Sequence, residues 1–263
     1  MTIYKRQPIL IFDWDDTILP SSFVDQWNIE HVNELPPHFQ KLFNELGRCA
    51  EQCLATASIY GEVIIITNSD EGWVRFSAER FIPHLLPVIE KYRIVSARTR
   101  YEKFYPQQPM VWKAAAFAHE VNEIYETGKQ EVNVVPMIEE SDVSSDDDSA
   151  RSEIEPIKSR NREIISIGDS IEERNAVQVV SRQFSAIPKS VMFISNPSPL
   201  QLIGQLNMLT KHMEFVCSNE SSLDLEISPH QAQRCAEIYL EQIRPARTLY
   251  QESQRRNVVE VEN

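Results

Sequence analysis

The chain has 263 residues, of which 42% are hydrophobic and 25% charged. This length fits one large α/β domain or two smaller ones, and the composition is typical of a soluble globular protein. The net charge of −13 argues against a broad basic surface that would bind nucleic acid, although an enzyme acting on a nucleic acid end stays possible.

The sequence shows no membrane or secretion signal. No apolar run approaches the roughly 20 residues that a membrane-spanning helix needs. Near the N-terminus, a four-residue apolar run, Ile9 to Phe12, is followed by an acidic cluster, which is not the pattern of a secretory signal. The four cysteines lack the spacing of a zinc ribbon or a CxxC motif. We therefore expect reduced, mostly buried thiols in a cytoplasmic or nuclear protein.

Short apolar runs alternate with helical stretches along the chain. We predict strands at residues 9–12, 63–66, 92–95, 164–167 and 191–194, and helices at about 36–57, 71–90, 110–127 and 171–182. Continuous apolar strands of this length are typical of a parallel sheet whose two faces are both covered by helices. The order of elements predicts an α/β fold with a doubly wound, mostly parallel sheet, similar to a Rossmann fold.

Two segments lie outside this alternation. Residues 139–155 hold eight acidic residues and one arginine, and therefore −7 of the net charge, with almost no apolar content. We expect a disordered insertion at about 138–160. Farther on, Leu223–Ile227 alternates like a half-exposed strand, and residues 229–256 look helical until Pro245. These patterns divide the chain into a main domain, residues 1–212, and a C-terminal α+β extension, residues 213–263, packed on it.

Polar clusters follow three of the predicted strands. Asp13 to Thr17, Thr67 to Asp70 and Gly168 to Ser170 each begin where an apolar run ends. In such a sheet the chemistry lies at the carboxyl ends of the strands. Three carboxylates near one point, with no His or Cys beside them, favour a hard cation such as Mg²⁺, and adjacent loop amides suit an anion. The sequence therefore predicts phosphoryl transfer.

The motifs in this order resemble the haloacid dehalogenase (HAD) superfamily, of the phosphatase type with an aspartate nucleophile. The run Ile9 to Thr17 resembles its hhhhDxDxT motif, and Val63 to Asn68 its second motif. Lys113 fits the lone lysine of the third motif, and Ile164 to Glu173 resembles the fourth. The strings at 68–74 and 94–101 are similar to a eukaryotic branch of the superfamily.

The resemblance implies a role for each site residue. Asp13 would form an aspartyl-phosphate, and Asp15 would act as general acid and base; an acid at that position favours a phosphatase or phosphotransferase. Thr67 and the amide of Asn68 would bind phosphoryl oxygens, and Lys113 would neutralise charge there. Mg²⁺ would bind the Asp13 carboxylate, the Asp15 carbonyl and the Asp169 carboxylate. Glu173 and Ser170 would lie beside these ligands without binding the ion directly.

Simpler interpretations stay open for several of these residues. Asp13 and Asp15 could be turn formers, Thr67 could simply end a strand, and Asp169 could cap a helix. Lys91 or Lys103 could take the role of Lys113, and Glu173 could be a solvated helix acid. Asp16 and Ser170 look like local caps. The tryptophans Trp14, Trp73 and Trp112 look like packing residues.

Two further features bear on the substrate and its regulation. The 45 residues from 18 to 62 have room for a flap and a crossover helix, or for a very small cap. A site without a cap favours a phosphoprotein or another bulky phosphomonoester as the substrate.

In the acidic insertion, Ser144, Ser145 and Ser152 each precede an acid by three residues, which is the pattern that acidophilic kinases phosphorylate. The insertion is then either a regulated segment or a solvated linker.

We therefore expect a Mg²⁺-dependent phosphatase of the HAD type, with no cap or a minimal one, whose partner is its phosphorylated substrate. One alternative is a phosphotransferase or phosphomutase on the same fold. The other is a non-catalytic scaffold of that fold that binds partners through its acidic insertion.

Overall fold

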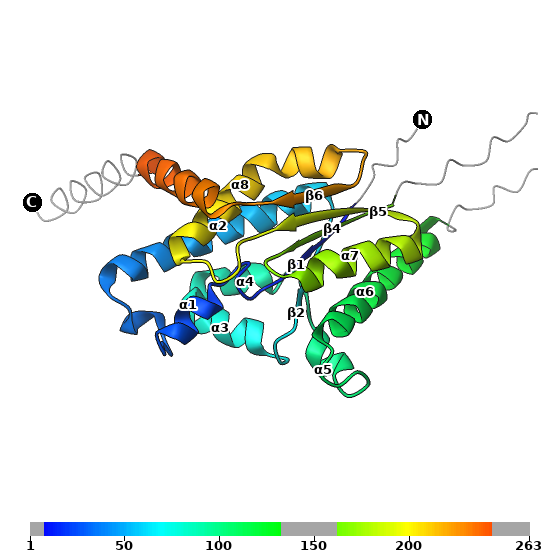
Figure 1. Cartoon of the computed structure of the whole chain (residues 1–263), viewed down its shortest axis with the longest axis horizontal. Coiled ribbons are helices and arrows are strands. Elements are labelled where there is room, and N and C mark those ends of the chain that lie inside the picture. Colours follow the sequence, from blue (N-terminus) through cyan, green and yellow to red (C-terminus); the bar gives the residue numbers. More distant parts are fainter. Residues whose placement is uncertain (1–7, 133–161, 244–263) are drawn as a thin grey trace, which may run out of the picture.

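In the computed structural model, which describes residues 8–132 and 162–243, the chain folds around a six-stranded sheet. All neighbouring strands in it are parallel, in the order β3-β2-β1-β4-β5-β6 (Figure 1). The strands are β1 (Ile9–Phe12), β2 (Glu62–Thr67), β3 (Arg93–Ser96), β4 (Arg162–Gly168), β5 (Ala186–Met192) and β6 (Leu223–Glu226). The predicted parallel α/β sheet is confirmed.

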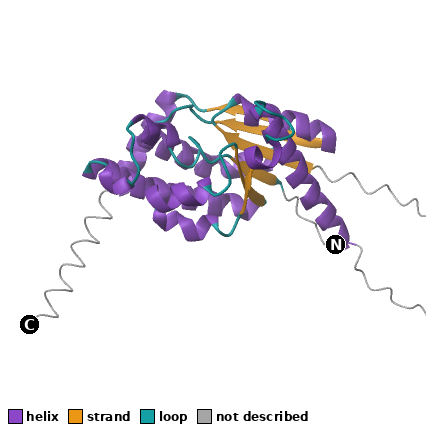
Figure 2. Cartoon of the chain, turned by 90° about the horizontal axis from the view of Figure 1, so that it is seen from below, coloured by secondary structure: helices purple, strands orange, loops and turns teal. Residues whose placement is uncertain are grey.

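Helices cover both faces of this sheet (Figure 2). They are α1 (Ser21–Gln26), α2 (Pro37–Tyr60), α3 (Trp73–Phe81), α4 (Leu86–Ile89), α5 (Ala97–Tyr101), α6 (Pro109–Val132), α7 (Ile171–Phe184) and α8 (Pro199–Ser218). Two short 3₁₀ helices, η1 (Val32–Glu34) and η2 (Pro83–Leu85), and a helix over residues 229–243 complete the described chain.

The central strand β1 explains why the sheet needs cover on both sides. Its side chains alternate between the faces because successive residues of a strand point in opposite directions. Leu10 and Phe12 belong to the core beneath α2, α3 and α8, whereas Ile9 and Ile11 belong to the core beneath α6 and α7. None of the four is more than 1% exposed.

The helices of the structure differ from the predicted ones in three places. The predicted helix 71–90 is broken into α3, η2 and α4, because Pro83 and Pro87 cannot continue an α-helix. The five-residue helix α5 was not predicted, and neither was α8. The sequence of α8 is apolar around much of its circumference, since it packs against both α2 and the helix at 229–243, so it lacks the one-sided pattern of a surface helix.

The C-terminal part of the chain extends the same sheet. Strand β5 begins at Ala186, five residues before the predicted start, and β6 forms beside it as expected from the alternation at 223–227. Residue 212, where the chain was divided, lies inside α8. Lys189 of β5 is fully buried and donates to Glu163 of β4 and to the carbonyl of Val216 in the last turn of α8, at 2.7 and 2.8 Å. The ion pair joins β5 to β4, and the hydrogen bond to Val216 holds the end of α8 on the sheet.

Several predictions concern residues that lie outside the described ranges. The acidic insertion at about 138–160 with Ser144, Ser145 and Ser152 is among them, as is the chain beyond residue 243. All four cysteines are described and carry no disulfide, and three of them are buried. None of the helices in the described ranges has the length and apolar character required to span a membrane.

Candidate active site and metal centre

The polar clusters meet at the carboxyl edge of the sheet, between β1 and β4. The chain moves outward from β1 through β2 to β3 and then returns to β4 on the other side of β1. At such a switch point the loops after the two central strands diverge and leave a crevice. Asp13 follows β1, with its amide donating to the carbonyl of Ile167 at 2.8 Å, and Asp169 follows β4.

Lys113, in the second turn of α6, lies at the centre of the site and is fully buried. Its ammonium nitrogen is 2.7 Å from Asp13 Oδ1, 2.7 Å from Glu173 Oε1 and 2.7 Å from the carbonyl oxygen of Ile66. Burial alone would lower the pKa of Lys113, but the negative charges of Asp13 and Glu173 outweigh burial and raise it. The three N–H donors of the lysine are thus all used, and it stays charged.

Glu173 is held by the beginning of α7. Its second oxygen, Oε2, accepts hydrogen bonds from the amide and the hydroxyl of Ser170. The bond from the Ser170 amide belongs to the capping box at the beginning of α7. Burial would raise the pKa of Glu173, but the charge of Lys113 and these hydrogen bonds lower it. Glu173 is therefore a buried, charged partner of Lys113 and not a solvated acid, and Ser170 is the cap expected from the sequence.

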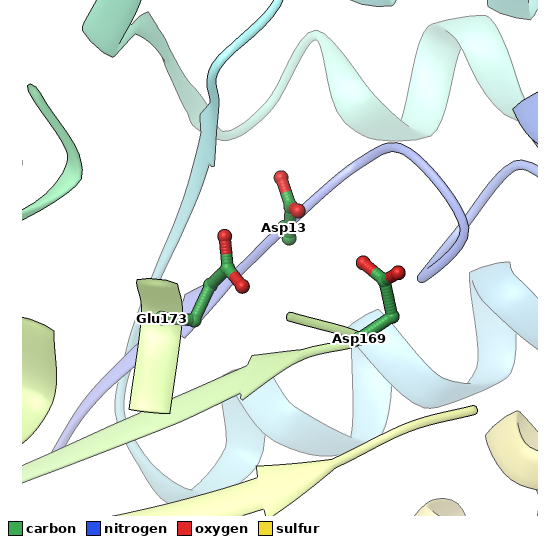
Figure 3. Close-up of side chains that lie close together, drawn as sticks. All are labelled: Asp13, Asp169 and Glu173. Atoms are coloured by element: carbon green, nitrogen blue, oxygen red, sulfur yellow. The ribbon is translucent and has the colours of Figure 1, made fainter. Parts of the chain in front are cut away.

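Asp13, Asp169 and Glu173 form a cluster of three carboxylates (Figure 3). One oxygen from each lies within 4.8 Å of the others, and the close-up shows the carboxylates gathered around a common space. Burial raises the pKa of Asp13 well above its ordinary value, with Glu173 and Asp15 adding to the effect and Lys113 opposing it. Burial, together with the charges of Glu173 and Asp16, raises the pKa of Asp169 to about 7. Lys113 thus compensates the charged form of Asp13 only in part, and the charged form of Asp169 has less compensation still.

Asp15 faces the end of β2 and the loop that follows it. Its Oδ2 accepts hydrogen bonds from the hydroxyls of Thr67, at 3.0 Å, and Ser69, at 2.7 Å. Its Oδ1 accepts one from the indole nitrogen of Trp73, at 2.7 Å. Three donors from the chain between β2 and α3 therefore hold this carboxylate in one orientation.

The remaining predicted residues lie at the same edge. The hydroxyl of Thr67 also accepts a hydrogen bond from the amide of Ser69, at 2.9 Å, so a phosphoryl oxygen would have to compete with Asp15 for its proton. The side chain of Asn68 donates to the carbonyl of Pro109, at 3.2 Å, and so ties the β2 loop to the beginning of α6. Asp16 accepts from the amide and hydroxyl of Ser22 and is the local cap that the sequence indicated.

The structure also distinguishes between the candidate lysines. Lys91 and Lys103 are exposed, and Lys103 lies over the ring of Phe104, whereas Lys113 contacts Asp13. Trp14 is buried in the core as expected. Trp73 packs partly against the core too, but its contact with Asp15 was not predicted. Because helical spacing says only which face a tryptophan occupies, nothing in the sequence indicated the partner of its N–H group.

The segment between β1 and β2 is built around one long helix. Its long helix α2 is the crossover helix, packed on the sheet and on α8, and only the shorter elements α1 and η1 precede it within the described chain. A small, partly open hollow of about 60 Å³ lies beside Thr67, bordered by residues 70–72, Ser96 and Arg100.

We compared the chain with known proteins in three ways. No protein-family model matches it, and neither a curated protein nor a solved structure gives a match. The chemistry of the site must therefore be inferred from its own geometry and from the sequence motifs.

Proposed function

We propose that the protein is a Mg²⁺-dependent phosphomonoester hydrolase that works through an aspartyl-phosphate on Asp13. The observation that carries this proposal is the buried triad in which Lys113 bridges Asp13 and Glu173 at the switch point of the sheet. Such an arrangement orients one carboxylate oxygen and leaves the other for attack. The resemblance of the four sequence motifs to the HAD superfamily supports the same reaction.

The charge balance of the cluster fits a divalent cation. Asp13, Asp169 and Glu173 contribute three negative charges and Lys113 one positive charge, so the group carries −2. Carboxylate oxygens are the ligands that Mg²⁺ prefers, and burial of uncompensated carboxylates is costly without a cation. Asp13, Asp169 and the carbonyl of Asp15 would hold the ion, because both oxygens of Glu173 are already engaged. When bound, Mg²⁺ would neutralise charge on the transferred phosphoryl group.

The chain's own groups would then carry the two chemical steps. Lys113 and the amide of Trp14 both contact Oδ1 of Asp13, so Oδ2 would attack phosphorus while the bond to the leaving oxygen breaks. Asp15 would give its proton to that oxygen. In the second step water would attack the aspartyl-phosphate, with Asp15 accepting the proton and Asp13 leaving as a carboxylate.

The surroundings of the site favour a phosphate group on a large molecule. Both α6 and α7 begin at this edge, and the N-terminal ends of helices attract anions. With α2 packed on the sheet, the described chain has no separate cap domain over the site. A bulky substrate such as a phosphoprotein would itself help to exclude water.

Hydrolysis of para-nitrophenyl phosphate, with and without Mg²⁺, tests this proposal. We expect Mg²⁺-dependent release of nitrophenol by the wild type and a loss on the order of 10³-fold or more in Asp13→Asn. Asp25→Asn, which changes an exposed aspartate of α1, is the matched control and should keep full activity. Phosphopeptides should be tested in parallel. A folded wild type that hydrolyses neither class of substrate, or activity that survives in Asp13→Asn, would contradict the proposal.

A further inference from the structure

Asp15 is oriented by groups that do not belong to its own loop. Thr67 ends β2, Ser69 lies in the following loop, and Trp73 is the first residue of α3. We propose that Trp73 and Ser69 are positioning residues that aim the Asp15 carboxyl group at the leaving oxygen of the substrate. The inference rests on the proposed function, because a general acid is needed at this place only if the site cleaves a phosphomonoester.

Trp73 suits this task because its donor is fixed and has one function. An indole N–H donates a hydrogen bond and cannot accept one, so it fixes a single oxygen of the carboxylate. The ring packs partly against the core, and Gly72, with a left-handed φ of 89°, allows the sharp turn that begins α3 at Trp73. The indole nitrogen is 2.7 Å from Asp15 Oδ1 as a result.

Ser69 is held equally well. Its amide donates to Thr67 Oγ1 at 2.9 Å, and its carbonyl accepts from the hydroxyl of Ser96, at the end of β3, at 2.6 Å. With both backbone groups fixed, its hydroxyl reaches Asp15 Oδ2 at 2.7 Å. The two oxygens of Asp15 thus each have a rigidly supported donor, and rotation of the carboxyl group would break a hydrogen bond on either side.

This arrangement makes a prediction that a purely structural role does not make. Proton donation matters little when the leaving group is a stable anion such as para-nitrophenolate, and much when it is an alkoxide. General acid catalysis contributes about 10²- to 10⁴-fold. A misaligned Asp15 would therefore slow phosphoryl transfer from alkyl phosphates far more than from para-nitrophenyl phosphate.

The experiment compares kcat/KM for para-nitrophenyl phosphate, phenyl phosphate and a phosphoserine peptide in Trp73→Phe, which keeps the ring and removes the donor. We use kcat/KM because it reports on phosphoryl transfer and excludes the hydrolysis of the aspartyl-phosphate, where Asp15 would act as a base with every substrate. We expect a loss of about tenfold or more with the phosphoserine peptide and less than about twofold with para-nitrophenyl phosphate. Ser69→Ala should also lose more activity with the phosphoserine peptide than with para-nitrophenyl phosphate. Ser69→Thr, which keeps the hydroxyl, should behave like the wild type. The substrate ratio is the activity with the phosphoserine peptide divided by that with para-nitrophenyl phosphate. In an Asp15→Asn background, Trp73→Phe should have no further effect on this ratio.

Trp112→Phe is the matched control. It also removes one indole donor, but the indole of Trp112 donates to the carbonyl of Tyr105, at 2.6 Å, and not to Asp15. Its substrate ratio should equal that of the wild type. Equal losses on all three substrates in Trp73→Phe, or no loss, would overturn the positioning role while leaving the hydrolase intact. A wild type that is inactive on all three substrates would instead overturn the proposed function, and the positioning role with it.

Discussion

At the scale of single residues, Lys113 connects the packing of the fold with the proposed chemistry. A fully buried lysine is tolerated only if its charge is compensated, and here two carboxylates and a carbonyl oxygen surround it. The same contacts hold Asp13 in place. The residue therefore links the folding of α6 onto the sheet to the orientation of the proposed nucleophile.

Replacing Lys113 by methionine tests this link. The change removes one partner of a buried ion-pair group and leaves Asp13 and Glu173 uncompensated, which costs about 3–5 kcal/mol of unfolding free energy at neutral pH. The loss should shrink in acid, where both carboxylates become protonated. Urea denaturation measures it, with the exposed Lys91→Met as the control. An unchanged unfolding midpoint in Lys113→Met would show that the triad does not contribute to stability.

At the scale of elements, the junction of β4 and α7 determines where Glu173 lies. Gly168 ends the strand, Ser170 caps the helix, and Glu173 follows one turn later. A Cβ atom on Gly168 would be 2.7 Å from Cγ and 3.1 Å from Cβ of Glu173, closer than atoms pack. The helix can approach the strand this closely only because residue 168 has no side chain.

Gly168→Ala should therefore move Glu173 or the first turn of α7. We expect a loss of about 1–3 kcal/mol of unfolding free energy, as for other overpacked sites, together with reduced hydrolysis because the Lys113 contact is disturbed. Thermal unfolding and turnover of para-nitrophenyl phosphate measure the two effects. A variant with wild-type stability and activity would mean that the junction adapts without cost.

At the scale of the whole molecule, the carboxylate cluster makes stability depend on pH and on metal. Because burial raises the pKa of Asp169 from its ordinary value near 4 to about 7, the folded protein holds this proton more tightly than the unfolded chain does. The contribution of Asp169 to the free energy of unfolding is therefore fully present below pH 4 and is lost as the pH rises toward 7. A cation that favours the charged form would reverse the loss.

Thermal melting of the wild type and Asp169→Asn in EDTA, from pH 4 to pH 8, tests this behaviour. At pH 8 we expect the variant to melt at the higher temperature, because its amide carries no buried charge, and the difference should vanish toward pH 4. Adding Mg²⁺ at pH 8 should raise the melting temperature of the wild type and leave that of the variant nearly unchanged. A constant difference across the pH range would refute the linkage.

The sequence by itself determined the parallel sheet and the place of the polar clusters. Uninterrupted apolar runs such as Ile9–Phe12 are buried on both faces, and parallel strands bring the residues that follow them to one edge. This reasoning was enough to predict that Asp13, Thr67 and Asp169 follow strands at that edge.

Only the tertiary structure decided which distant groups complete the site. Lys113 could not be distinguished from Lys91 by its local sequence, and its selection depends on how α6 packs on the sheet. The same holds for Trp73, whose N–H group finds Asp15 across 58 residues of chain, and for α8, which is apolar around much of its circumference because other elements surround it. The hydrophobic pattern of a segment indicates which face of its helix or strand is buried. The partner of a polar atom, in contrast, depends on how elements far apart in the sequence pack together.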